Sequence, residues 1–211
     1  MTLRGVVLFP KAMMPLRIFE ERYRQMLDEV LSTTRIFGIV CERENVSQDE
    51  AHLEHPYSVA TAGLIRVSKK HQDGTSFVLL QGIKRVRVCG IAREMPYRII
   101  ETEEMDSILD QSCSQIRKQI EEALEQNKLL GGDVTDEMLD FLNPLDDDDA
   151  FVDLAAFTLC KHTLRKQAML EVQQLDKRAS MLLTDLHREN DRLATIKQMM
   201  SQSEDDGSEK N

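Results

Sequence analysis

The residue types best suited to hold a metal ion gather in the polar stretch from 41 to 56. Cys41, Glu50, His52, Glu54 and His55 all carry side chains that can ligate transition metals. Two histidines at i and i+3 share one face only when they lie on a helix, and this stretch has the composition of a loop. Its spacing also differs from that of structural zinc sites. We therefore expect no metal site and no bound cofactor.

A run of aspartates at 146–149 could in principle bind calcium. The alternating ligands and central glycine of an EF-hand loop are absent, however. An apolar helical pattern begins directly after the run, at Phe151. Carboxylates at the start of a helix cap its free N–H groups and interact favourably with its dipole. We therefore interpret the run as a helix start, with Asp149 as the cap.

The sequence lacks motifs for covalent or phosphate chemistry. It has no G-x-S-x-G turn to present a serine nucleophile. It has no G-x-x-x-x-G-K-[ST] loop to bind phosphates. Cys41, Cys89, Cys113 and Cys160 form no C-x-x-C pair, and we interpret them as buried free thiols. We predict no catalytic residue and no enzymatic activity.

The best candidate for a binding segment runs from Phe9 to Pro15. Prolines at both ends restrict this loop, and its two methionines offer adaptable, polarizable side chains of the kind that promiscuous peptide-binding surfaces use. We name Phe9, Met13 and Met14 as candidate peptide-binding residues. The alternative is that Phe9 and one of the methionines pack in the core.

The composition is that of a soluble globular protein, with 41% apolar and 30% charged residues. No apolar run approaches the roughly 20 residues of a membrane span, and the start lacks a secretory pattern. We therefore expect a cytoplasmic protein without a membrane partner. The net charge of -10 argues against a nucleic-acid partner, because it repels phosphates. We interpret the basic residues between Ile65 and Arg93 as a solvated face of strands.

The first hundred residues have the pattern of short strands. Apolar runs with β-branched residues predict strands at 6–9, 35–41, 58–67, 75–81, 86–89 and 97–102. The pair Asp73-Gly74 predicts a hairpin. One predicted helix interrupts the strands. Its apolar residues at helical spacing are Ile18, Phe19, Tyr23, Met26, Leu27, Val30 and Leu31.

From about residue 105 the apolar spacing changes from two residues to 3.6, which predicts helices. Gly131-Gly132 ends the first of these, and Thr135 can cap the second. The last helix begins near Leu175, and its apolar stripe extends beyond what the short preceding helices can cover. We name Leu193, Ile196 and Met200 in that stripe as candidates for partner docking or self-association.

The predicted fold class is α+β. We expect a β-rich subdomain at 1–104, with one helix, and a helical subdomain at 105–200 that ends in a long helix. The polar, acidic tail at 201–211 is predicted to be disordered, because it has almost no apolar residues to bury.

Several blocks of the chain resemble the N-terminal, substrate-binding domain of Lon proteases. The first consists of Leu3–Pro10 with Pro15–Tyr23, and the second is Gln81–Val86, which is similar to the family's L-x-G-x-x-R-F although Gln81 and Val86 depart from it. Three helical stretches are similar to the family's F-x-D-x-x-A, K-Q-x-x-L-E and D-x-x-R-L. They are Phe151–Ala155, Lys166–Glu171 and Asp176–Arg178.

This resemblance implies a PUA-like β pseudobarrel followed by a helical bundle, in a stand-alone form without the ATPase and peptidase parts. It also implies binding of unfolded or exposed apolar polypeptide segments, as an adaptor in protein quality control. An alternative is a small-molecule or peptide-terminus binding module that uses a groove between barrel and helices. A third hypothesis, RNA contact through the basic strands, is disfavoured by the charge and by an aromatic content of 5%.

Overall fold

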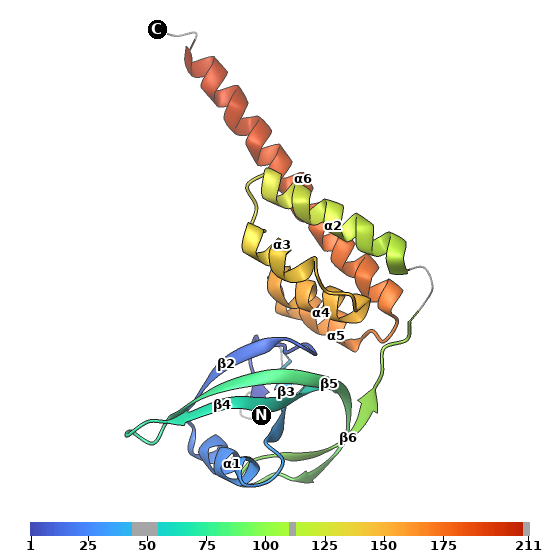
Figure 1. The fold of residues 1–211 in the computed structure, drawn as a ribbon. Coiled ribbons are helices and arrows are strands. Elements are labelled where there is room, and N and C mark those ends of the chain that lie inside the picture. Colours follow the sequence, from blue (N-terminus) through green and yellow to red (C-terminus); the bar gives the residue numbers. More distant parts are fainter. Residues whose placement is uncertain (44–54, 110–112, 209–211) are drawn as a thin grey trace. The chain divides into compact units, whose positions relative to one another are not determined.

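The computed structural model describes residues 1–43, 55–109 and 113–208. The chain divides into two compact units. Unit 1 consists of Met1–Ser107 together with Lys161–Gln173, and unit 2 consists of Ile108–Cys160 together with Gln174–Asn211. The predicted fold class is confirmed: a mixed β-sheet with one helix comes first, and a helical region that ends in a long helix follows (Figure 1).

Among the described residues of unit 1, the strands form one sheet in the order β1-β3-β4-β5-β2, and β6 also pairs with β5. Their bounds are β1 (Thr2–Leu3), β2 (Met13–Ile18), β3 (Ile36–Cys41), β4 (Val59–Lys70), β5 (Ser76–Arg93) and β6 (Ile99–Met105). The pair β1–β3 is parallel, and the other pairs are antiparallel. Strand β5 is therefore the centre of the sheet, with β2 along its first part and β6 along its last.

The hairpin between β4 and β5 forms where Asp73-Gly74 predicted it. Gly74 has a φ of 80°, a conformation that costs glycine little, and the His71 N–H donates to the Thr75 carbonyl at 2.8 Å. The two strands predicted after this turn are one continuous strand, β5. Its pairing with β4 shifts register at Ala62/Gly63 and at Ile65/Val67, and such bulges bend a strand without ending it.

The sheet curls so that non-neighbouring strands meet (Figure 1). A Cβ atom added at Gly38 in β3 would lie 3.8 Å from the Ile100 side chain in β6. Helix α1 (Glu21–Leu31) buries Tyr23, Met26 and Leu27 in this unit. The helical periodicity was thus correct for the middle of α1. Phe19, which we placed in the same apolar stripe, instead precedes the helix and is 64% exposed.

The predicted strand at 6–9 is wrong, although its residues are buried. Val7, Leu8 and Phe9 lie in irregular backbone that bonds to the sheet through isolated contacts. The Thr61 hydroxyl donates to the Leu8 carbonyl at 2.5 Å. Buried apolar residues without a strand partner give the same sequence pattern as a short buried strand, so the pattern could not separate the two.

The turn that follows is held against β5 at Gly82. The Lys11 N–H donates to the Gly82 carbonyl at 2.8 Å, and the Gly82 N–H donates to the Ala12 carbonyl at 2.9 Å. A Cβ atom at position 82 would lie 2.0 Å from the Phe9 carbonyl oxygen. Only glycine allows the two backbones to approach this closely, so Gly82 sets the path on which the chain enters β2.

Unit 2 contains α2 (Cys113–Leu129), α3 (Asp136–Leu142), α4 (Asp148–Leu159) and α6 (Leu175–Ser208). Gly131, with a φ of 78°, follows the end of α2, as predicted. Thr135 caps α3 by accepting a hydrogen bond from the Met138 N–H. The cap of α4 is Asp147 and not Asp149, because the Asp147 carboxylate accepts from the Asp149 N–H at 3.0 Å.

Two polar clusters are buried in unit 2. The Asn127 side-chain amide of α2 donates to the Asn190 side-chain oxygen of α6 at 2.8 Å, and the Asn190 side-chain amide donates to the Ala123 backbone carbonyl at 2.8 Å. Asn190 lies at a position where the helical spacing of α6 would place an apolar residue. Its pairing with Asn127 explains why a polar residue is buried there. In the second cluster, Arg178 forms an ion pair with Asp153 at 3.0 Å, and both side chains are fully buried.

Two boundaries differ from the sequence reading. Helix α5 (Thr163–Glu171) lies in the helical half of the sequence but belongs to unit 1. Helix α6 continues to Ser208, into the segment that the sequence predicted to be disordered. Serine, glutamate and aspartate are tolerated at the end of an existing helix, because elongation costs much less than nucleation. None of the described helices is long and apolar enough to cross a membrane.

Candidate functional site

Several apolar side chains on the outer face of the sheet in unit 1 are exposed to solvent. Along β2, side chains alternate between the core and the surface, so Met14 and Ile18 are buried while Met13 and Pro15 are exposed. Its neighbour β5 has the same alternation, with Val78 and Leu80 fully buried. We call the outward-facing set of Met13, Pro15, Val67, Phe77 and Leu79 the exposed sheet face.

Strand register brings this set together. Pro15 of β2 pairs with Leu79 of β5, and Leu79 also pairs with Val67 of β4, which gives an apolar row across three strands. In the adjacent row, Phe77 lies between Arg17 and Lys69. The exposed fractions are 41% for Met13, 47% for Val67 and 40% for Phe77. A contiguous apolar surface of this kind marks an interaction site more often than scattered apolar residues do.

Positive charges frame the exposed sheet face. Arg17 and Lys69 flank Phe77, and Arg66 lies at the bulge beside Val67. The Arg66 guanidinium donates to the Gln81 side-chain oxygen at 2.7 Å, which fixes its position next to the apolar row. We predicted a solvated face for the basic residues between Ile65 and Arg93. Arg66 and Lys69 are exposed, but Arg85 is buried, so the prediction is wrong for that residue. Around the exposed sheet face, the cations surround an apolar centre.

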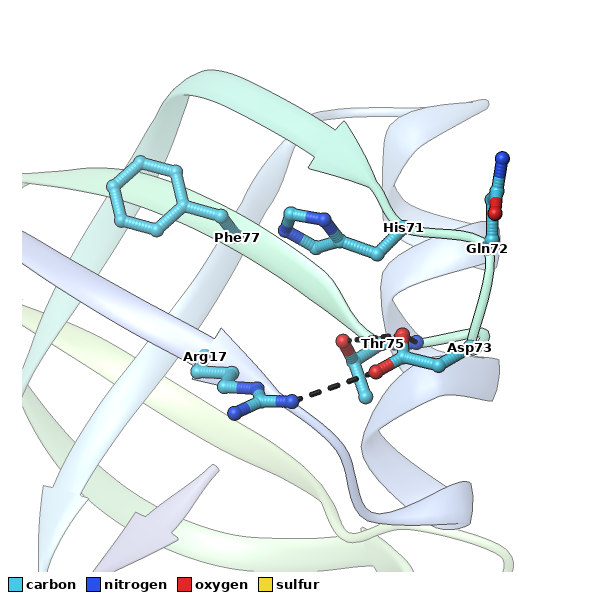
Figure 2. Close-up of a pocket in the computed structure, with 6 residues that line it drawn as sticks. All are labelled: Arg17, His71, Gln72, Asp73, Thr75 and Phe77. Atoms are coloured by element: carbon cyan, nitrogen blue, oxygen red, sulfur yellow. Dashed lines mark hydrogen bonds and ion pairs between the residues drawn. The ribbon is translucent and has the colours of Figure 1, made fainter.

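A shallow hollow lies beside Phe77, at the end of the β4–β5 hairpin (Figure 2). It is lined by Arg17, His71, Gln72, Asp73, Thr75 and Phe77. The His71 and Phe77 rings lie next to each other, and Arg17 points toward Asp73 across 3.5 Å (Figure 2). Hydrogen bonds from the Thr75 hydroxyl and N–H hold the pKa of the Asp73 carboxyl below its usual value. The carboxylate is therefore engaged within the turn, and the hollow extends the apolar surface toward Arg17.

The three predicted peptide-binding residues do not lie together. Phe9 has no exposed surface, and Met14 is 8% exposed, so both pack in the core. Met13 alone belongs to the exposed sheet face. The three predicted docking residues are on α6 in unit 2: Leu193 is half-buried, whereas Ile196 and Met200 are exposed by 41% and 61%.

The described residues contain no group of three or more metal-ligating side chains. Cys41 is buried in β3. Glu50, His52 and Glu54 lie outside the described residues.

Sequence reasoning missed Val67, Phe77 and Leu79. One signal was available, because Phe77-Val78-Leu79-Leu80 is an unbroken apolar run. In a strand, such a run places apolar side chains on both faces of the sheet. The other signal, the register that aligns Pro15, Leu79 and Val67, cannot be read from a single strand.

The residues that carry the family resemblance in unit 1 turn out to join α5 to the sheet. Buried Arg85, from the block around Gly82, donates through Nε to the Leu170 carbonyl at 3.2 Å. Gln167 donates through its side-chain amide to the Val59 carbonyl at 3.0 Å and to Glu171 at 3.0 Å. These contacts explain why α5 belongs to unit 1.

In unit 2 the other two resembling stretches also meet. Phe151 and Asp153 of α4 are buried, and Asp153 forms its ion pair with Arg178 at the start of α6. Arg178 also pairs with Asp149, on the same helix α4 as Asp153. A buried ion pair adds little net stability, but removing Arg178 would take the cation away from the buried Asp153 carboxylate at a large cost. Most residues of these blocks therefore form packing contacts that define the fold. Of their residues, Pro15 alone, in the first block, also belongs to the exposed sheet face.

Together, the fold and the exposed sheet face define an α+β module that presents an apolar surface framed by cations. The chain belongs to the family of ATP-dependent protease La (LON) substrate-binding domains, whose model matches residues 1–188. The predicted family is thereby confirmed.

Full-length relatives are much longer than this chain. The Lon protease of Desulfosudis oleivorans is 24% identical over 212 residues, which cover 98% of this chain and 26% of that protein. The Lon protease of Escherichia coli strain K12 is 25% identical over 203 residues, which cover 93% of this chain and 25% of that protein. The chain therefore spans about a quarter of the length of these relatives.

Two solved structures share the fold. A Lon N-terminal domain protein from Xanthomonas campestris aligns with a TM-score of 0.61 at 20% identity, over 87% of this chain and 95% of that one. The N-terminal domain of the Mycobacterium avium complex Lon protease aligns with a TM-score of 0.68 at 13% identity, over 89% and 96% of the two chains. At these identities the similarity supports the fold alone.

Proposed function

We propose that the exposed sheet face binds apolar segments of unfolded or partly unfolded polypeptides. The observation that carries this proposal is the apolar row of Pro15, Leu79 and Val67 across three strands, next to the exposed Phe77 ring. Covering a large apolar side chain contributes roughly 1.5–3 kcal/mol. A few such contacts suffice for binding in the micromolar range, once the cost of ordering the client is subtracted.

The binding mode should be contact across the face and not strand addition at the edge. Among the described strands, β2 pairs only with β5, so its other edge is available. Pro15 lies in the middle of β2 and has no N–H to donate. An added strand would therefore lack a central hydrogen bond, whereas side chains laid over the face meet no such obstacle.

The role of the module is binding without turnover. The matched part of the Lon relatives is the substrate-binding domain, and the sequence contains neither a phosphate-binding loop nor a nucleophile motif. We infer an adaptor in protein quality control, acting in the cytoplasm, that holds clients through apolar contacts. Membership in the family supports the adaptor role, and the apolar side chains of the exposed sheet face support its use as the binding surface.

Substitutions on the exposed sheet face test this function. The double substitution Val67→Ser and Phe77→Ser removes two exposed apolar side chains of its centre, and Ile91→Ser is the matched control. Ile91 lies on the same strand β5 and is 49% exposed, but it pairs with Ile100 in the other part of the sheet. The probe is a reduced, alkylated model protein that cannot refold, and its affinity is measured by fluorescence anisotropy.

We expect the double variant to bind the unfolded probe about tenfold more weakly or worse, since each lost contact is worth about 1 kcal/mol or more. The control should bind like the unaltered chain. Melting temperatures should stay within a few degrees, because all three side chains are exposed. Equal affinity for the unaltered chain and the double variant would contradict the proposal, as would an equal loss in the Ile91 control.

A further inference from the structure

The charge of the chain is unevenly placed with respect to the exposed sheet face. The chain carries a net charge of -10, yet Arg17, Arg66 and Lys69 surround the apolar row. The opposite pattern occurs at the end of α6. There the exposed residues Ile196, Met199 and Met200 are followed by an acidic stretch. Its acidic residues are Glu204, Asp205, Asp206 and Glu209.

We propose that the C-terminal segment 196–209 of a second copy of the chain docks on the exposed sheet face and competes there with polypeptide clients. This inference rests on the proposed function, because it assigns an occupant to the same surface. It turns the free end of α6 into a built-in competitor, so that client binding weakens as the protein becomes more concentrated.

The apolar part of the segment has the chemistry of a client. Ile196, Met199 and Met200 are exposed by 41%, 64% and 61%. Their spacing of three and four residues places Ile196 and Met200, and Ile196 and Met199, on the same side of a helix. Methionine side chains adapt to uneven apolar surfaces, which suits contact with the row formed by Pro15, Leu79 and Val67.

The polar part of the segment supplies charge complementarity. Between Lys197 and Lys210 the sequence has four acidic residues and no basic one, so this segment is opposite in charge to Arg17, Arg66 and Lys69. A cationic rim and an anionic segment attract over about 10 Å at moderate salt, and they favour association in one orientation.

A second copy can supply this segment with α6 continuous. Helix α6 has 34 residues, and at 1.5 Å per residue it is about 50 Å long. Its first residue, Leu175, lies two positions after the last residue of unit 1. Two copies can exchange their ends reciprocally and close a dimer, in which each exposed sheet face receives the acidic end of the other chain.

The test uses the full chain and a labelled synthetic peptide of residues 193–211. The tail variant carries Met199→Ser, Met200→Ser, Glu204→Gln, Asp205→Asn and Asp206→Asn, which remove both parts of the proposed competitor without shortening the chain. The face variant adds Arg17→Glu and Lys69→Glu to the tail variant. The control adds Lys118→Glu, an exposed charge on α2, instead.

We expect the peptide to bind the tail variant and the Lys118 control alike. Binding should weaken when salt is raised and should fall about tenfold or more in the face variant. The tail variant should bind the unfolded model protein several-fold more tightly than the unaltered chain. This difference should grow with protein concentration. Light scattering should show association of the unaltered chain and a monomeric tail variant.

Each other result has a defined meaning. If the peptide fails to bind while the tail variant still binds the unfolded protein, the inference is wrong and the proposed function stands. If the tail variant binds neither, the proposed function is wrong and the inference falls with it. Equal peptide binding by the face variant would place the contact elsewhere, for example between α6 helices, and would overturn the inference. A gain in client affinity that does not depend on concentration would assign the segment to its own chain and contradict the second copy.

Discussion

At the scale of single residues, the exposed fraction of a side chain indicates whether it packs in the core or is available for binding. Asn127 and Asn190 are polar yet 3% and 2% exposed, whereas Phe77 and Met13 are apolar yet exposed by 40% and 41%. The asparagines are tolerated inside because each has hydrogen-bond partners. The exposed apolar residues have no such explanation within unit 1, which is why we assign them to binding.

The asparagine pair gives a stability prediction. Replacing Asn127 by alanine removes the donor to Asn190 and the acceptor for the Val134 N–H, which is bonded at 3.2 Å. Each buried polar group left without a partner costs about 1–3 kcal/mol, so we expect Asn127→Ala to lower the free energy of unfolding by about 2–3 kcal/mol. Chemical denaturation followed by far-ultraviolet circular dichroism measures this value.

The exposed neighbour provides the control for that experiment. Gln126→Ala on the same helix should change the free energy of unfolding by less than about 0.5 kcal/mol. If Asn127→Ala and Gln126→Ala behave alike, the Asn127–Asn190 contact does not hold α2 and α6 together in the way the hydrogen bonds indicate.

At the scale of elements, one helix belongs to a different compact unit from the helices next to it in sequence. Helix α5 follows α4 in sequence but is bonded to β4 and β5 through Gln167 and Arg85. A helix of nine residues has little stability of its own, so its persistence depends on those contacts. We therefore expect α5 to open and close together with the sheet.

Native-state hydrogen exchange tests this conclusion with two alanine substitutions. Gly82→Ala forces the Phe9 carbonyl away from β5, so it should lower the protection of amides in β4, β5 and α5 together. Gly131→Ala meets no neighbouring atom within 4 Å but strains a positive φ, at a cost of about 1 kcal/mol, and should affect only the helices of unit 2. Loss of α5 protection in the Gly131 variant and not in the Gly82 variant would show that α5 belongs with α4.

At the scale of the whole molecule, the sequence could predict most elements and the fold class. The hairpin at Asp73-Gly74, strand β3, the Thr135 cap and the start of α6 at Leu175 all follow from local patterns. The errors lie where tertiary contacts decide. The irregular segment around Leu8 is held by a bond from Thr61, and the turn after it by bonds of Lys11 and Ala12 with Gly82, all between residues far apart in sequence. The membership of α5 depends on Arg85, which lies in the other half of the chain.

The candidate site was harder to predict than the fold. A loop with prolines and methionines pointed to Phe9, Met13 and Met14, but alternation along β2 turns Met14 inward and leaves only Met13 outside. The apolar row exists because the register of three strands aligns Pro15, Leu79 and Val67. The register between β4 and β5 depends on a bulge at Ile65/Val67, which the local sequence pattern does not predict.

The most direct test of the binding surface is a map of the amides that respond to a client. Isotope-labelled full-length chain is titrated with an unfolded, alkylated model protein, and backbone amide chemical shifts are followed by nuclear magnetic resonance. We expect the largest changes in β2, in β4 around Val67 and in β5 from Phe77 to Gln81, with little change around Ile91. Changes that concentrate in the helices of unit 2, or around Ile91 and Met95, and leave these three strands unaltered would contradict the assignment of the exposed sheet face as the binding surface.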